Sequence, residues 1–296
     1  VITPEVIEAF TACSDLAPLH NPANLKGVNA VTELMPGLPQ VGVFDTAFHQ
    51  TMPAKAYLYA VPYELYEKYG ARRYGFHGTS HRYVSARALE FLGMKAEGSK
   101  VVTAHIGNGG SLAAVVDGKC VDTTMGLTPL EGVMMGTRSG DIDGGAVAFI
   151  QKKLGLDADG ISDLLNKKSG IAGLTGLSSD MRDIENAANA GNERAQIAQD
   201  SYFYRIKKYV GAYAAAMGGI DVLVFTAGVG ENQTPMREDV CRGLEFMGIK
   251  IDAEKNAKIR GEEAIISTPD SRVKVVVIPT DEELMIASDT MALISK

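Results

Sequence analysis

Two glycine-rich segments follow apolar runs, and segments of this kind can bind anions through their backbone amides. The sequence Gly107-Asn108-Gly109-Gly110-Ser111 follows the run 101–105, and Gly228 to Asn232 follows the run 221–226. Residues without Cβ let neighbouring N–H groups point at one anion, and open α/β sheets bind ligands at the carboxyl ends of their strands. The first segment alone is equally consistent with a plain hairpin turn. The second segment favours a phosphate site, although neither one has the GxxxxGK[ST] or GxGxxG pattern.

Three charged residues lie where they could serve such a site. Arg138, in MGTRSGDID, could neutralise the charge of a transferring phosphoryl group, or it could simply face solvent. Asp45 follows the apolar run 41–44, which suits a carboxylate that holds a metal ion or a proton, and equally a helix or turn cap. Glu282 lies at an expected helix start, where it could bind Mg²⁺ directly or through water, or be a surface acid favoured by the helix dipole.

Four of the five histidines lie in polar sequence contexts, so zinc binding has to be considered. His77 and His81 are four residues apart, but the glutamate of an HExxH motif does not accompany them. We therefore favour donation to phosphate over zinc binding for this pair. The other two are His20, in APLHNP, and His105, directly before the first glycine segment.

Strands and helices alternate along the chain, which is typical of the α/β class. Asp117-Gly118 is a strong hairpin signal, so we expect a strand, the glycine segment, a strand, a turn and a strand in succession. Residues 227–232 are expected to form a loop. The expected strands are 41–44, 101–105, 111–116, 221–226 and 273–278, with one more after the Asp-Gly turn, and the expected helices are 21–35, 81–92, 145–154, 161–167, 193–217 and 281–294.

Two of these helices carry more specific expectations. The helix 193–217 should end at Gly218-Gly219 and turn inward Ile197, Tyr204, Tyr209 and Ala212. The last helix should begin with a capping box, in which Glu283 bonds the backbone of Thr280.

Composition limits the kind of protein. The chain has 296 residues, enough for two domains, and 46% of them are hydrophobic, as in soluble globular proteins. Its net charge of −7 argues against nucleic-acid binding. Three widely spaced cysteines fit a reducing cytoplasm, and the most apolar region, 210–230, is interrupted by Asp221 and several glycines, so we expect no membrane span.

Longer motifs point to one family. The segments YGFHGTSHRYV, HIGNGGS with CVDTTMGLTPLEGVMMGTRSGDID, TAGVGEN and IPTDEEL together closely resemble acetate kinase, in the family's order and from APLHNP to the final helix. The resemblance implies the fold of the acetate and sugar kinase, Hsc70 and actin superfamily, in which two ribonuclease-H-like domains close around ATP. It also implies reversible transfer of the γ-phosphoryl group of ATP to acetate, giving acetyl phosphate and ADP, with Mg²⁺ as cofactor and a homodimer as the usual form.

The resemblance also assigns roles to matching positions. Arg138 and His77 resemble the transition-state stabilisers, Asp45 resembles the essential aspartate, and Glu282 resembles the glutamate associated with Mg²⁺. The remaining roles are the phosphate loop, which corresponds to His105, Ile106, Gly107, Asn108 and Gly109, the adenosine-side contacts, which correspond to Asp180, Met181, Arg182, Gly228, Val229, Gly230, Glu231 and Asn232, and the small apolar acyl pocket, which corresponds to Leu19, Phe76 and Pro129.

Part of the family pattern does not occur in this sequence. The opening N-x-G-S-S-S-x-K hairpin and the H-R-x-V-H-G-G stretch carry a phosphate-side turn, a metal-associated asparagine and a second substrate arginine. We therefore expect an incomplete first domain, made of residues 1–50 and completed by 284–296, and a second, nucleotide-binding domain at 51–283. Two alternatives stay open: a propionate or butyrate kinase, because one methylene is worth only about 1–3 kcal/mol of discrimination, and a truncated nucleotide-binding module without catalytic activity.

Overall fold

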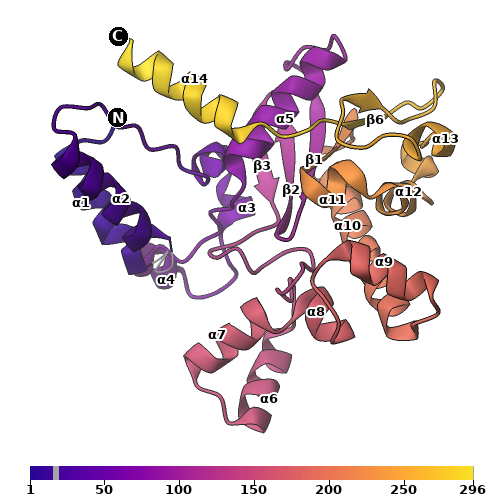
Figure 1. Cartoon of the computed structure of the whole chain (residues 1–296), viewed down its shortest axis with the longest axis horizontal. Helices are drawn as coiled ribbons and strands as arrows, with labels where there is room; N and C mark the ends of the chain where they lie inside the picture. The colour runs from indigo at the N-terminus through magenta and orange to yellow at the C-terminus, as the bar shows by residue number, and fades with distance from the viewer. Residues whose placement is uncertain (16–19, 296) are drawn as a thin grey trace.

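The computed structural model describes residues 1–15 and 20–295, and its centre is a six-stranded sheet (Figure 1). The strands are β1 (Lys100–Ile106), β2 (Gly110–Val116), β3 (Lys119–Thr123), β4 (Val222–Thr226), β5 (Ala264–Ile265) and β6 (Lys274–Val277). Their order is β3-β2-β1-β4-β6-β5. β1, β4 and β6 are parallel, and β2, β3 and β5 are antiparallel to their neighbours. The α/β class expected from the sequence is confirmed.

A tight turn joins β2 to β3. Asp117 and Gly118 both have left-handed backbone, with φ of 52° and 73°, which is the conformation that a two-residue type I′ turn requires. Val116 pairs with Lys119 across it. The predicted succession of strand, glycine segment, strand, turn and strand is therefore confirmed.

Helices surround the sheet, and several begin at a side chain that accepts a free backbone amide. Asp143, Asp157 and Asn192 are such caps. The helices predicted at 21–35, 81–92, 145–154, 161–167, 193–217 and 281–294 are all present, most with ends shifted by one to three residues. The α-helices are α1 (Pro4–Ala12), α2 (Asn21–Leu34), α3 (Ala54–Tyr57), α4 (Tyr63–Tyr69), α5 (Gly78–Phe91), α6 (Gly144–Leu154), α7 (Ala158–Lys167), α8 (Gly170–Thr175), α9 (Met181–Asn189), α10 (Glu193–Met217), α11 (Ala227–Asn232), α12 (Thr234–Cys241), α13 (Ala253–Asn256) and α14 (Glu282–Ile294), and the 3-10 helices are η1 (Cys13–Asp15), η2 (Ala47–Thr51) and η3 (Glu245–Met247).

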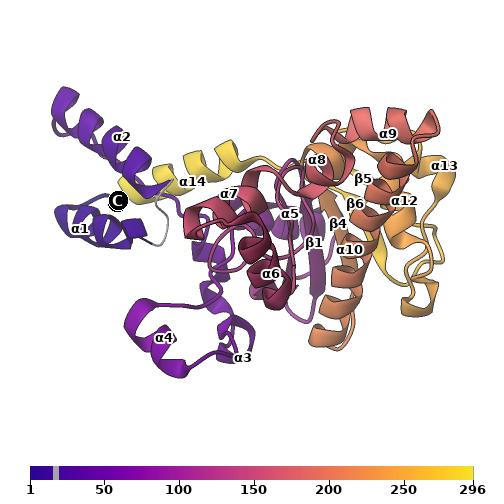
Figure 2. The ribbon, with the colours of Figure 1, turned by 90° about the horizontal axis from the view of Figure 1, so that it is seen from below.

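The sheet is covered on both faces. α5 lies on one side of β1 and β4 and α10 lies on the other, as Figure 2 shows. Successive residues of β1 alternate between these two layers: Val101 packs with α5, and Val102 packs with α10. Strands buried on both faces read as continuous apolar runs, which is why they could be recognised in the sequence.

The buried face of α10 differs from the predicted one. Ile197 and Tyr204 have exposed fractions of 62% and 60%, and Ala212 is also exposed, while Tyr209 is only partly buried. The buried residues include Tyr202, Phe203, Ile206, Val210 and Tyr213. The prediction was wrong because apolar residues occur around most of this helix, so periodicity alone does not select one stripe.

Residues 1–50 contribute no strand to the sheet in the part of this segment that the structure describes. The run 41–44, predicted as a buried strand, is extended but pairs with no strand, and its residues alternate between partly buried and exposed. That prediction was wrong, because a strand needs a neighbour to bond its backbone groups. α1 was not predicted, although Thr3 caps it and Pro4 occupies its first turn.

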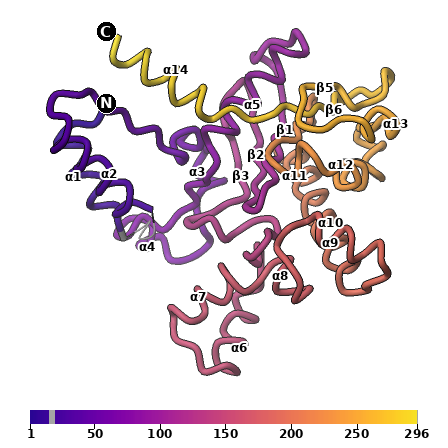
Figure 3. Tube along the Cα trace, viewed as in Figure 1, coloured from indigo at the N-terminus to yellow at the C-terminus, as the bar shows by residue number. Residues whose placement is uncertain are grey.

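α14 leaves the sheet on the side where α1 and α2 lie (Figures 1 and 2). Figure 3 traces the chain from β6 past α5 into this helix. An ion pair between Arg82 and Asp289 joins α14 to α5 there. None of the residues of α14 is buried.

The start of α14 differs from the predicted capping box. Asp281 is the cap, because its side chain accepts a hydrogen bond from the amide of Leu284 at 2.9 Å. Thr280 instead places its hydroxyl 2.8 Å from that of Ser80, and Glu283 is exposed. The predicted box was wrong because the helix begins one residue later, where an aspartate offers the stronger cap.

Residues 227–232, expected as a loop, form the short helix α11. The carboxylate of Glu231 accepts a hydrogen bond from the amide of Ala227 at 2.8 Å, and the side chain of Asn232 donates to the carbonyl of Gly228 at 2.9 Å. These two local bonds explain why a glycine-rich segment becomes helical.

Across the described residues, helices that are both long and apolar enough to cross a bilayer do not occur.

Candidate functional site

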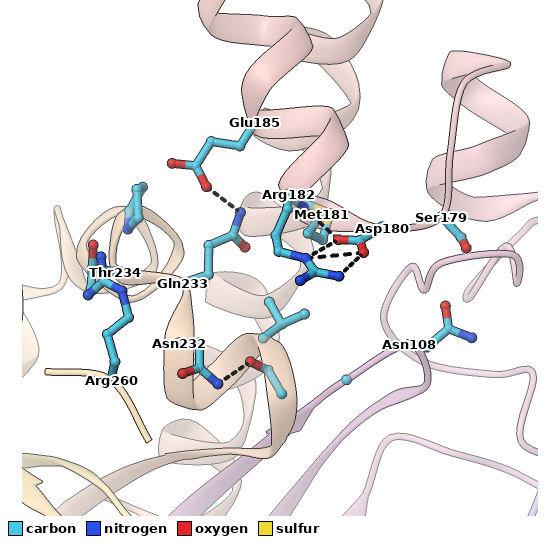
Figure 4. A pocket seen from close by; sticks show the side chains of 14 residues that line it. Asn108, Ser179, Asp180, Met181, Arg182, Glu185, Asn232, Gln233, Thr234 and Arg260 are labelled. Carbon is cyan, nitrogen blue, oxygen red and sulfur yellow. Dashed lines mark hydrogen bonds and ion pairs between the residues drawn. The ribbon is translucent and has the colours of Figure 1, made fainter. Parts of the chain in front are cut away.

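A cavity of about 750 Å³ opens beyond the carboxyl ends of β1 and β4 (Figure 4). Its walls are the glycine segment after β1, the start of α9, and the helices α11 and α12. Of the predicted nucleotide contacts, eight line it: Gly107, Asn108, Asp180, Met181, Arg182, Gly228, Val229 and Asn232. Sequence reasoning missed the other six: Ser179, Glu185, Gln233, Thr234, Pro235 and Arg260.

Gln233 carries an unusual feature of this cavity. Its amide nitrogen donates to a carboxylate oxygen of Glu185 at 3.3 Å, across the gap between α12 and α9. Its carbonyl oxygen Oε1 is buried and has no hydrogen-bond partner among residues 1–15 and 20–295. Because Glu185 accepts only, the amide cannot turn over without losing this bond, so Oε1 stays available to a donor in the cavity.

The remaining predicted nucleotide residues hold the walls. Ile106 is fully buried in the core, and His105 pairs with Ser111 in the sheet. Gly109 accepts the amide of Gly107 at 2.8 Å, which closes the turn after β1. Gly230 packs against β1, where a Cβ would lie 3.5 Å from the Ala104 carbonyl oxygen. The structure therefore places these residues behind the cavity surface.

A buried arginine anchors the far end of α11. Arg237 is fully buried, and its guanidinium donates to the carbonyl oxygens of Gly230 at 2.9 Å and Glu231 at 2.7 Å. It also donates to the side chain of Asn256 at 2.8 Å. Burial lowers the pKa of Arg237 to about 10. The local sequence carries no signal for this anchor, because its side-chain partner Asn256 lies 19 residues away and its nearer partners are backbone carbonyls.

His77 and Arg138 converge on the turn after β1. A Cβ built on Gly109 would lie 3.5 Å from Nη1 of Arg138 and 3.6 Å from Nε2 of His77. The absence of a side chain at Gly109 leaves open the space that both groups face. The structure thus brings together a guanidinium, an imidazole and the glycine turn.

Arg138 is held without a carboxylate partner among the residues that the structure describes. Its Nη1 donates to the Pro129 carbonyl oxygen at 3.2 Å, and partial burial lowers its pKa. The carbonyl of Arg138 accepts the amide of Met135 at 3.1 Å, which fixes the loop that carries it. A guanidinium with most of its donors unpaired is suited to bind an oxyanion.

A second arginine fixes the start of this loop. Arg73 donates to the carbonyl oxygens of Thr123 and Thr124 at 2.9 and 2.8 Å and forms an ion pair with Glu131. Tyr59 donates to the same carboxylate at 2.7 Å. Arg73 therefore holds the start of the segment 124–138, together with Glu131 within it.

Three buried histidines and the partly buried His77 gather around the glycine turn. Burial lowers the pKa of His77 to about 4 and keeps those of His81 and His105 well below their usual value. The rings of His77 and His105 are stacked, with centroids 4.2 Å apart. His49, whose pKa burial also lowers to about 4, completes the group. His20 is exposed and lies outside this cluster.

Asp45 meets the start of α5. Its carboxylate accepts the hydroxyl of Thr79 at 3.1 Å, and its carbonyl accepts the amide of Gly78 at 3.0 Å. A Cβ on Gly78 would lie 2.0 Å from that carbonyl oxygen, so only glycine fits. The preceding residue, His77, has a left-handed backbone with φ of 55°.

The charge of Asp45 acts on the carboxyl group of Glu282. Partial burial raises the pKa of the Glu282 carboxyl, and the charges of Asp45 and Glu283 raise it further. Among the described residues, groups of three or more His, Cys, Asp or Glu side chains arranged for a metal ion are absent. The carboxylates of Asp45 and Glu282 suit Mg²⁺ by their chemistry, because this ion keeps several waters and commonly uses one or two carboxylates with substrate phosphates.

The predicted acyl pocket is only partly described. Phe76 and Pro129 are both partly buried beside the histidine cluster and Arg138 respectively, since their carbonyls accept hydrogen bonds from His49 and Arg138. Leu19 lies outside the described residues.

The chain is similar to proteins of one family over almost its whole length. The model of the Acetokinase family matches residues 1–288. The chain is 71% identical over 296 residues to the acetate kinase of Bacteroides fragilis and 63% identical over 298 residues to that of Thermotoga maritima. Each alignment covers 100% of this chain and 74% of the relative, so the chain spans about three quarters of the length of these relatives.

Comparison with solved structures gives similar matches. The crystal structure of Porphyromonas gingivalis acetate kinase matches with a TM-score of 0.96 at 62% identity, covering 99% of this chain and 73% of that one. A propionate kinase from Francisella tularensis matches with a TM-score of 0.91 at 45% identity, covering 97% and 73%.

Proposed function

The chain belongs to the acetokinase family, and from this we propose that it is an acetate kinase, which transfers the γ-phosphoryl group of ATP to acetate and gives acetyl phosphate and ADP. One observation carries the proposal beyond the family: a cavity large enough for a nucleoside opens beside the turn on which Arg138 and His77 converge. The nucleotide and the reacting phosphoryl group would thus occupy adjoining places.

The chemistry requires little activation of the nucleophile. A carboxylate is already ionised at neutral pH, so a general base is unnecessary. Phosphoryl transfer depends on alignment and on neutralising charge at the transferred oxygens. In this proposal, Arg138 supplies positive charge and the neutral imidazole of His77 donates a hydrogen bond, both from one side of the Gly109 turn.

The nucleotide would lie along the cavity. Gly107 and Asn108 would approach the phosphates through the turn after β1, with His105, Ile106 and Gly109 as its frame. Asp180, Met181 and Arg182 at the start of α9 would contact the adenosine side from one wall. Gly228, Val229 and Asn232 would do so from the other, on a helix that Gly230 and Glu231 hold in place.

Asp45 and Glu282 are the residues that would hold Mg²⁺. When bound, the ion supplies positive charge that offsets the phosphate oxygens and the two carboxylates. Without it, the Glu282 carboxyl has a raised pKa, chiefly because of its partial burial and further because of the charge of Asp45.

We further propose the domain division that the resemblance implies, with residues 1–50 and 284–296 in a first ribonuclease-H-like unit and 51–283 in a second one. The sheet, the cavity, Arg138 and His77 all lie within 51–283. A cytoplasmic homodimer is part of the same proposal.

A propionate kinase is the second candidate, because a propionate kinase shares the fold at 45% identity. Phe76 and Pro129 would limit the acyl chain in either case. Acetate is favoured because the acetate kinases compared above are 62–71% identical to this chain.

The test is acetyl phosphate formation from Mg-ATP, trapped as the hydroxamate, with acetate, propionate and butyrate compared at equal concentration. ATP binding is followed by calorimetry on the same sample. We expect ATP binding and the highest kcat/KM with acetate. Preference for propionate or butyrate would favour the second candidate. ATP binding without turnover on any acid would show a nucleotide-binding module instead, and loss of both signals would refute the proposal.

A further inference from the structure

The hydroxyl of Ser111 lies between two histidines. Its Oγ is 2.8 Å from Nδ1 of His77 and 2.7 Å from Nε2 of His81. Ser111 and His81 are fully buried, so bulk water does not compete for these groups. The other ring nitrogen of His81, Nδ1, lies 2.7 Å from the hydroxyl of Thr103, which is also fully buried. Four side chains therefore form one chain of hydrogen bonds.

In this series of hydrogen bonds, each imidazole has one donor and one acceptor nitrogen. Burial favours the neutral form of both rings and lowers the pKa of both. A neutral imidazole carries its proton on one nitrogen only. Ser111 has a single hydroxyl hydrogen, so it can donate to one histidine while it accepts from the other.

Only two arrangements satisfy all three of these hydrogen bonds. In the first, Thr103 donates to His81 Nδ1, His81 Nε2 donates to Ser111, and Ser111 donates to His77 Nδ1. In the second, every bond runs the opposite way, from His77 Nδ1 towards Thr103. Any mixed arrangement leaves a buried donor or acceptor unpaired, which costs about 1–3 kcal/mol.

The two arrangements differ at the atom that faces the glycine turn. In the first, Nε2 of His77 carries a hydrogen and can donate to an oxyanion beside Nη1 of Arg138. In the second, Nε2 presents a lone pair, which repels the same oxyanion. Bound phosphate therefore selects the first arrangement.

We propose that Ser111 is a positioning residue, whose hydroxyl, backed by His81 and Thr103, holds His77 as the Nε2–H tautomer when an oxyanion is bound. The inference rests on the proposed phosphoryl-transfer site for its role in turnover. The coupling itself does not: the Nε2–H tautomer of His77 requires the Nε2–H tautomer of His81.

The coupling is tested by ¹⁵N NMR of the imidazoles in the whole chain, with ADP and inorganic phosphate added. The His77 signals are identified by comparison with His77→Gln, and those of His81 with His81→Asn. We expect both rings to be Nε2–H tautomers. A liganded His77 with its hydrogen on Nδ1, or a His81 with its hydrogen on Nδ1, would overturn the proposal. This readout needs no turnover, so it stands or fails separately from the acetate kinase activity.

Kinetics provide the second test. Ser111→Ala should lower kcat about tenfold to 100-fold, less than the roughly 10²- to 10³-fold cost of removing a stabilising donor outright. KM for ATP and acetate should change by less than about threefold, because binding contacts remain. Ser111→Thr keeps the hydroxyl and should recover most of kcat.

The matched control is Ser85→Ala, which removes a buried hydroxyl of α5 that bonds only the Arg82 carbonyl. Its kcat should stay at the wild-type value, and thermal unfolding should show that both variants are folded. Unchanged kcat in a folded Ser111→Ala protein would refute the positioning role. If Ser111→Ala fails to fold, the NMR measurement on the wild-type protein still decides.

Discussion

Oε1 of Glu231 accepts a hydrogen bond from the backbone amide of Thr280 at 3.2 Å, across 49 residues of sequence. The same oxygen accepts the amide of Ala227 at 2.8 Å. One carboxylate oxygen therefore fixes the start of α11, which lines the nucleotide cavity, to the segment that leads into Glu282. A residue expected to contact adenosine instead joins the cavity wall to the candidate metal site.

Glu231→Ala should destabilise the protein by about 1–3 kcal/mol, because two partly buried amides lose their acceptor. Glu231→Gln keeps a carbonyl oxygen at that place and should retain most of the stability. Urea unfolding of the two variants makes the comparison. Equal stability of the alanine variant and the wild type would contradict this role.

Asp281→Ala should cost about 1 kcal/mol of stability, the usual value for a lost helix cap. Glu283→Ala is the matched variant, in the first turn of the same helix. It should change stability by less than about 0.5 kcal/mol because its side chain is exposed. Thermal unfolding distinguishes the two. The reverse order of effects would restore the capping box that the sequence suggested.

Arg138→Ala should lower kcat on the order of 10³-fold, as loss of a transition-state arginine does, with little change in the melting temperature. Arg138→Lys should not restore activity, because an ammonium lacks the planar fork of donors. Arg242→Ala, at the exposed residue that follows α12, is the control. A kcat for Arg138→Ala within a few-fold of wild type would remove this residue from the proposed mechanism.

Gln233→Met replaces a buried, unpaired carbonyl with an apolar group of similar length. We expect Kd for ATP to rise about two- to tenfold, since one net hydrogen bond is worth about 0.5–1.5 kcal/mol. The stability of the ligand-free protein should change by less than about 1 kcal/mol, because the lost hydrogen bond to Glu185 is offset by the removal of an unsatisfied buried polar atom. Calorimetry and urea unfolding give the two values, and Gln196→Met on the exposed side of α10 is the control. An unchanged Kd would show that Oε1 does not meet the nucleotide.

Stability should decrease as the pH falls from about 6.5 to about 4. The folded-state pKa values of His49 and His77, at about 4, lie below the value of about 6.5 expected for an unfolded chain. In this window the unfolded chain binds more protons than the folded one, so each histidine contributes a loss of up to about 1.4 kcal/mol per pH unit. His81 and His105, shifted in the same direction, add to it.

His49→Gln isolates one of these contributions. The glutamine amide can still donate to the Phe76 carbonyl, which His49 bonds at 2.9 Å, but it does not titrate. The slope of unfolding free energy against pH should decrease by up to about 1.4 kcal/mol per pH unit, which is the contribution of one proton. An identical slope in wild type and variant would show that His49 takes up its proton equally in both states.

The parts of the fold that the sequence predicted well depend on local signals. Asp117-Gly118 fixes a hairpin without help from distant residues, and the strands β1, β4 and β6 are apolar on both faces. The run 41–44 carries the same apolar signal, but whether it pairs depends on a neighbouring strand that the run itself does not encode. The prediction of the buried face of α10 was wrong for a related reason, since only the packing of the helix on the sheet decides which of its apolar sides is covered.

The candidate site divides in the same way. Motifs that are continuous in sequence, such as the one from His105 to Gly109, could be recognised as units. Gln233 and Arg237 could not, because their partners lie 48 and 19 residues away and exist only once the helices are packed. Ser111 could be read as the end of a glycine segment, but its two histidine partners follow from the approach of α5 to the sheet.

The close fit of Gly78 against Asp45 has a mechanical consequence. The amide of Gly78 and the carbonyl of Asp45 form a contact with no room for a side chain, directly beside His77. A point of contact this tight acts as a pivot. If the segment carrying α1 and α2 rotates about it, those helices sweep a wide arc while the carboxylate of Asp45 and the imidazole of His77 hardly change their separation. Large movements of the outer part of the molecule would then leave the spacing of these two groups almost constant.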